Sequence, residues 1–189
     1  MISTDGFCCL AGAFLLLVLP LDWVISAVTA ALVHEFSHIL AVMLLGGKIV
    51  KIRISVTGCQ IETLPMGELK SALCILAGPV GSFLLLLFRR KLPQIAVFGF
   101  FQGVYNCLPV MPLDGGRLLH GLLCRICPDR TEQVMLWIRI CLCAGLVLVG
   151  LVLMAYYKMD IVIMISYLLF NIGLGGRKIP CKENRIGLQ

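Results

Sequence analysis

Residues 23–45 read WVISAVTAALVHEFSHILAVMLL, an apolar run long enough to cross a membrane. All of its ionisable side chains fall within residues 34–38, HEFSH. Such side chains are costly inside a bilayer unless they are paired, so they indicate a functional site. His34 and His38 are four residues apart and therefore lie on one face of a helix. There they could bind one zinc ion, with Glu35 as the general base.

The composition indicates a membrane protein. The chain has 189 residues, of which 60% are hydrophobic and only 14% are charged, whereas a soluble domain carries about 25% charged residues. We therefore expect one membrane-embedded domain over residues 1–176 and a polar C-terminal tail over residues 177–189. No basic stretch is long or interleaved with aromatic residues, so we expect no nucleic-acid partner.

Six apolar runs predict about six transmembrane or re-entrant helices. They cover residues 7–20, 23–45, 69–88, 92–108, 132–157 and 161–174. The first, fourth and sixth are short for a full crossing, which makes tilted or re-entrant helices the alternative there.

A different pattern lies between the second and third runs. Polar and apolar side chains alternate over residues 51–56, KIRISV, with the period of two that is typical of a half-buried strand. Thr57 and Gly58 offer a turn, and residues 59–62 could return as a second strand. The sequence thus predicts an all-α polytopic membrane protein with a short β-hairpin after its second helix. An exposed edge of that hairpin could bind an unwound substrate segment by β-augmentation.

The distribution of Lys and Arg predicts the orientation in the membrane. With six crossings, the loops at 46–68 and 109–131 and the C-terminal tail share one side. That side carries most of the 16 basic residues, namely Lys48, Lys51, Arg53, Lys70, Arg117, Arg125, Arg130, Arg139, Arg177, Lys178, Lys182 and Arg185. The other side carries Arg89, Arg90, Lys91 and Lys158. We therefore expect both termini, and the site on the second helix, to face the cytoplasm.

A catalytic zinc needs a third protein ligand and an open position for water. His120 is one candidate, and Asp114 is the better one. Asp114 lies in residues 106–117, NCLPVMPLDGGR, where two prolines end a helix. Interrupted backbone at membrane depth is tolerated where it lines a polar cavity or is buried in protein. The charge count also places Asp114 on the side of His34 and His38, although its carboxylate could instead cap a helix.

The two motifs together resemble the site-2 protease family of intramembrane zinc metalloproteases. The resemblance rests on HEFSH at residues 34–38 and on Asn, Pro, Pro, Leu-Asp-Gly-Gly within residues 106–116. Residues 58–62 and 77–79 also match, and the compact layout is most similar to the branch typified by stage IV sporulation protein FB. Ser82 departs from the pattern, because many members carry asparagine at that position. A PDZ-like insert or a nucleotide-sensing domain would not fit within this length.

The resemblance implies a role for each residue of the site. His34, His38 and Asp114 would be ligands to one Zn²⁺, and Glu35 would be the catalytic base. Asn106 would orient the substrate or stabilise the oxyanion.

The resemblance also implies a function and a location. The chain would hydrolyse peptide bonds of membrane-spanning or membrane-tethered proteins in a bacterial cytoplasmic membrane, with a sigma-factor precursor or an anti-sigma factor as the implied substrate. Other membrane proteins would regulate it.

Two other functions remain open. A catalytically inactive relative could serve as a membrane scaffold, although a scaffold does not need Glu35 beside a metal. A metal-handling transporter could use the same three ligands for transit. The other apolar runs carry few acidic or histidine residues, which argues against a transport pathway.

Overall fold

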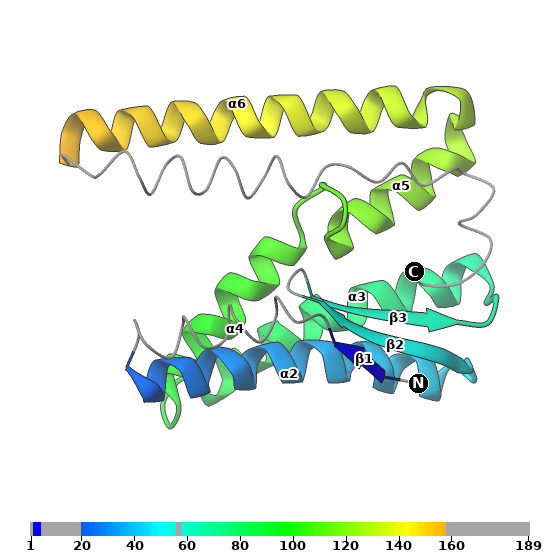
Figure 1. Cartoon of the computed structure of the whole chain (residues 1–189), viewed down its shortest axis with the longest axis horizontal. Helices are drawn as coiled ribbons and strands as arrows, with labels where there is room; N and C mark the ends of the chain where they lie inside the picture. The colour runs from blue at the N-terminus through cyan, green and yellow to red at the C-terminus, as the bar shows by residue number, and fades with distance from the viewer. Residues whose placement is uncertain (1, 5–19, 56–57, 158–189) are drawn as a thin grey trace.

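The computed structural model describes residues 2–4, 20–55 and 58–157 (Figure 1). Residues 7–19 of the first predicted span, the whole sixth span and the C-terminal tail lie outside the described residues.

The described part of the chain is mostly helical. Its helices are α2 (Leu21–Leu44), α3 (Glu68–Leu84), which a 3-10 turn η1 (Leu85–Phe88) extends, α4 (Pro93–Asn106), α5 (Asp114–Ile126), a 3-10 turn η2 (Pro128–Arg130) and α6 (Thr131–Tyr157). The second to fifth predicted spans correspond to α2, α3 with η1, α4 and α6. Of these, α2 and α3 with η1 are long and apolar enough to cross a membrane.

Helix α5 was not expected, because residues 109–131 were predicted to form a loop. Leu113 precedes the helix in an extended conformation and Asp114 opens its first turn, where a carboxylate is favourable beside the positive end of the helix dipole. The helix is 13 residues long, and its buried residues are Asp114, Gly116 and His120. A short helix of mixed polarity gives no apolar run, so a search for membrane spans misses it.

The predicted hairpin is present as β2 (Ile49–Ser55) and β3 (Gly58–Thr63), antiparallel with Ile52 opposite Ile61. The description as all-α is incomplete, however. The strand β1 (Ile2–Thr4) pairs in parallel with β2, and the strand order is β1-β2-β3. The alternating strand is therefore the central one of the described sheet, and β3 has the free edge. The alternation over residues 51–56 alone could not predict that this strand is central, because β1 comes from a distant part of the sequence.

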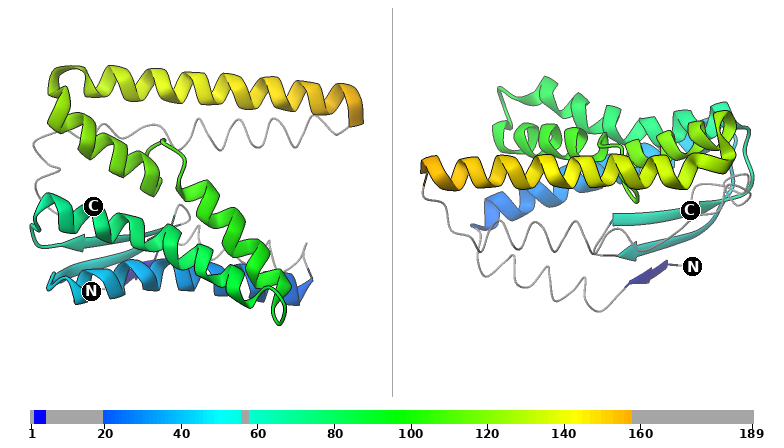
Figure 2. Two further views of the ribbon diagram at one scale, coloured as in Figure 1. Left: turned by 180° about the vertical axis from the view of Figure 1, so that it is seen from behind. Right: turned by 90° about the horizontal axis from the view of Figure 1, so that it is seen from above.

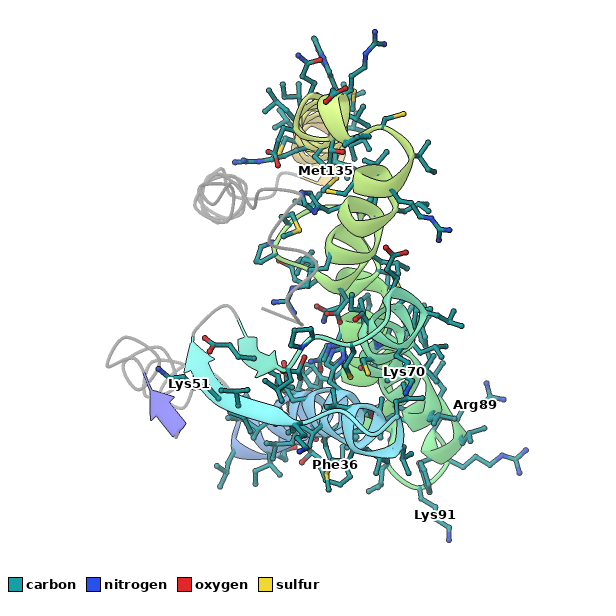
Figure 3. All side chains as sticks on the ribbon, turned by 90° about the vertical axis from the view of Figure 1, so that its right-hand side faces the viewer. Phe36, Lys51, Lys70, Arg89, Lys91 and Met135 are labelled. Carbon is teal, nitrogen blue, oxygen red and sulfur yellow. The ribbon has the colours of Figure 1, made fainter. Side chains whose placement is uncertain are left out.

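Helix α2 packs against α3 and α4 (Figure 2). Its buried positions follow one another at intervals of four residues: Ser26, Ala30, His34, His38 and Val42. The opposite face is apolar and exposed, with Phe36 62% exposed and pointing away from the other helices (Figure 3). Such an arrangement suits a helix that buries polar groups inward and presents apolar side chains to lipid.

The contact between α2 and α3 is close because small residues line it. A Cβ placed on Gly81 of α3 would overlap the Ser37 hydroxyl of α2. Small residues at a crossing let two backbones approach, which is how helices associate in membranes. This approach sets the position of α3 relative to the histidines of α2.

Candidate metal centre

Three donor atoms from two helices converge in the interior. His34 and His38 come from the buried face of α2, and Asp114 comes from the first turn of α5. The Oδ2 atom of Asp114 lies 3.1 Å from Nε2 of His34 and 3.2 Å from Nε2 of His38. The two Nε2 atoms are 3.3 Å apart. All three residues are at most 7% exposed.

This triangle has the dimensions of a zinc site. A tetrahedral ion about 2.0–2.1 Å from each donor requires donors about 3.3–3.4 Å apart. The observed separations of 3.1 to 3.3 Å are close to that value. Two imidazoles and one carboxylate also form the donor set that a catalytic zinc site uses, with one position left for water. These residues therefore fit the metal that the sequence implies.

The far nitrogen of each ring has a partner on α3. Nδ1 of His38 donates to the backbone carbonyl of Cys74 at 2.8 Å. Because a carbonyl only accepts, the proton of the neutral ring is on Nδ1, and the lone pair of Nε2 faces the site. Nδ1 of His34 lies 2.8 Å from the Ser82 hydroxyl oxygen.

Between these two partners, α3 carries Gly78. A Cβ on Gly78 would overlap the imidazole of His38 and crowd that of His34. The missing side chain provides the space that the two rings fill.

The loop before α5 positions Asp114 at the start of that helix. A Cβ on Gly115 would overlap the carbonyl of Cys107, and one on Gly116 would overlap the backbone of Val110. Both glycines thus allow α5 to begin against the loop that leaves α4. Asp114 is not the helix cap, because Leu113 occupies that position.

The charge of Asp114 is favoured by its neighbours. Asp114 lies outside α2 and α3, the helices of the described residues that could span a membrane. Burial acts to raise the pKa of its carboxyl, but hydrogen bonds and positive charge from His34 and His38, supplied when these rings carry a proton on Nε2, outweigh burial and hold that pKa below its ordinary value. Arg117 adds a distant cation, with Nη1 at 4.0 Å from Oδ1. The group is therefore ready to act as an anionic ligand.

The other candidates take different positions. Glu35 is half-buried beside His34 and acts electrostatically on His38. Asn106 ends α4, where its amide donates to the carbonyl of Gln102 at 3.1 Å. His120 is buried, and its Nε2 lies 3.4 Å from a carboxylate oxygen of Glu132. In the part of the chain that the structure describes, the metal-ligand cluster contains Asp114 and not His120.

Sequence reasoning found the three donors but not their supports on α3. Cys74, Gly78 and Ser82 are four residues apart, so one face of α3 carries all three. That spacing was visible in the sequence. The contact of these residues with the histidines could not be predicted, because it depends on how α3 is aligned with α2.

Comparisons with known proteins found a family model and a solved structure that are similar to this chain. Residues 7–93 match a family model described as Peptidase M50B-like. Among solved structures, the site-2 protease from Methanocaldococcus jannaschii is similar, with a TM-score of 0.65 and 20% sequence identity over 92% of this chain and 88% of that one. At that identity the likeness shows a common fold. None of the curated proteins compared matches the chain.

Proposed function

We propose that this chain is an intramembrane zinc metalloprotease of the site-2 protease family. The observation that carries the proposal is the buried triangle of His34, His38 and Asp114 beside the carboxylate-bearing Glu35. The family model matched over residues 7–93 and the fold shared with a site-2 protease support it.

Each residue has a defined task in the proposed reaction. His34, His38 and Asp114 hold the ion, which when bound supplies polarisation of the scissile carbonyl and activation of a water molecule. Glu35 takes the proton of the attacking water and delivers it to the leaving amine. Asn106 ends α4 next to the loop that leads to Asp114, and its amide orients the substrate or stabilises the oxyanion. The bond to Gln102 uses one of its two amide N–H groups.

The proposed substrate is a membrane-spanning or membrane-tethered protein that unwinds locally, because a helix hides its carbonyl groups. A substrate segment unwound in this way pairs with β3, the strand at the free edge of the described sheet. Proline substitutions along β3 that left cleavage unchanged would refute this part of the proposal.

The setting that we propose follows the charge bias of the sequence. The protein crosses a bacterial cytoplasmic membrane several times, with both termini and the site toward the cytoplasm. Similarity to the stage IV sporulation protein FB branch suggests a sigma-factor precursor or an anti-sigma factor as substrate, and regulation by other membrane proteins.

The test is cleavage of a membrane-tethered sigma-factor precursor fused to a reporter and co-expressed with the full chain. Glu35→Gln keeps the side-chain size and removes the base, so we expect cleavage to fall by about 10²–10⁴-fold. Zinc binding should persist, because Glu35 is not a ligand. The matched control is Glu68→Gln, which changes an exposed carboxylate that pairs with Arg125 at the surface, and it should cleave normally.

Three outcomes would overturn the proposal. Full cleavage by Glu35→Gln would remove the mechanism. Zinc passage into vesicles without cleavage would identify a transporter. Zinc binding with neither passage nor cleavage would identify a scaffold.

A further inference from the structure

One face of α3 supports both histidines, and it does so in three different ways. Cys74 offers its backbone carbonyl, Gly78 offers an absent side chain, and Ser82 offers a hydroxyl. These residues follow one another at intervals of four, so successive turns of a single helix meet the two rings. The pattern makes α3 the supporting helix of the site, although it contributes no metal ligand.

The support of the two rings is unequal. The partner of His38 is a backbone carbonyl, which any side chain at position 74 would preserve and which only accepts a hydrogen bond. The partner of His34 is a side-chain hydroxyl, which both accepts and donates. Ser82 is 0% exposed, so solvent water does not reach this position to replace its hydrogen bond to His34.

A hydroxyl suits the two states that His34 must adopt. Without a metal, a proton on Nε2 of His34 can be shared between Asp114 Oδ2 at 3.1 Å and Nε2 of His38 at 3.3 Å. Nδ1 then accepts a hydrogen bond from Ser82. With a metal, Nε2 must be free, so the proton lies on Nδ1 and Ser82 accepts it. A carbonyl in the same place would serve only the second state.

We propose that Ser82 is a positioning residue of the metal centre, which fixes the ring of His34 and accepts its Nδ1 proton when Nε2 binds zinc. This inference rests on the proposed function for the identity of the metal. Partners that bind the far nitrogen of a ligating histidine orient its ring and raise its basicity, and their loss costs about 10–100-fold in metal affinity.

The test measures Zn²⁺ affinity of the full chain in detergent by competition with a coloured chelator. We expect Ser82→Ala to weaken zinc binding by about 10–100-fold and to change the visible absorption of the Co²⁺-substituted protein. Ser82→Thr keeps the hydroxyl and should restore most of the affinity. The matched control is Ser37→Ala at the same helix contact, because that hydroxyl donates to the carbonyl of Val33 in its own helix.

A purely structural role would give a different result. Ser82→Ala would then lower the melting temperature of the metal-free protein and leave the affinity of the folded fraction at the wild-type value, which would overturn the inference. A folded Ser82→Thr variant that fails to bind zinc would overturn it as well. If the proposed function failed while the inference held, the wild-type protein would bind zinc, its affinity would depend on Ser82, and it would not cleave the substrate.

Discussion

Helix α2 carries two clusters of polar side chains, one near its start and one in its second half, and the two differ in their access to water. Near the start of the helix, the Ser26 hydroxyl lies 2.7 Å from the carbonyl of Asp22 and 3.3 Å from Oε1 of Gln94 on α4. The amide of Gln94 donates to the Asp22 carboxylate at 3.3 Å. The single hydroxyl proton of Ser26 cannot fully serve both acceptors, but Asp22 is exposed and Gln94 is half-buried, so water can complete their hydrogen bonds.

In the second half of the helix, acceptors also exceed donors, but there the cluster is buried. Nε2 of His34, Nε2 of His38 and Oδ2 of Asp114 meet within 3.3 Å of one another, and the neutral rings have one proton to share among these atoms. A cation balances such a buried site, whereas water can satisfy the exposed acceptors beside Ser26. A shortage of donors in a membrane helix therefore indicates a metal site where the polar groups are buried, and needs no ion where they reach water.

The largest expected effect comes from His38→Ala, which removes one acceptor from the buried cluster. With a single histidine and Asp114 left, we expect zinc affinity to fall by more than about 100-fold, beyond the usual cost of losing a partner outside the ligand set. Cleavage should fall with it. Chelator competition and the reporter assay measure both, and wild-type affinity in this variant would show that the triangle is not the metal site.

A smaller effect is expected from Gly78→Ala, which leaves every ligand in place. The added methyl group would enter the space of both imidazoles, and overpacking of this kind costs about 1–3 kcal/mol. We expect weaker zinc binding together with a lower free energy of unfolding.

Gly67→Ala is the control for that change, since a Cβ at Gly67 meets nothing within 4 Å. It should leave zinc affinity unchanged. If both variants bound zinc as the wild type does, the close fit of α3 against the rings would not matter for the site.

The sequence could indicate the buried cluster because its signals are local. Two histidines four residues apart share a helix face whatever surrounds them, and the proline-rich stretch before Asp114 marks an interruption by itself. The prediction that Asp114 lies beside the histidines needed the family resemblance and the count of Lys and Arg on each side of the membrane. The structure places the three side chains together.

What the sequence did not predict depends on distant contacts. The strand β1 is three residues long and exists through its pairing with Ile52, Arg53 and Ile54. Ser82 was noticed as a departure from a family pattern, but its role follows from the alignment of α3 with α2. Helix α5 was missed because its 13 residues are too short and too polar to register as a membrane span.

The smallest effect is expected at the water-accessible cluster, from Ser26→Ala. Its hydroxyl proton is shared between the carbonyl of Asp22 in its own helix and Oε1 of Gln94 on α4, and losing a hydrogen bond costs about 0.5–1.5 kcal/mol. We expect that decrease in the free energy of unfolding, measured by denaturant titration in detergent, with zinc affinity unchanged. Thr29→Ala is the control, because that hydroxyl bonds to the carbonyl of Ile25 within the same helix and should cost less. If Ser26→Ala reduced zinc affinity as strongly as Ser82→Ala, the two polar clusters of α2 would be coupled, and access to water would no longer separate a packing cluster from a metal site.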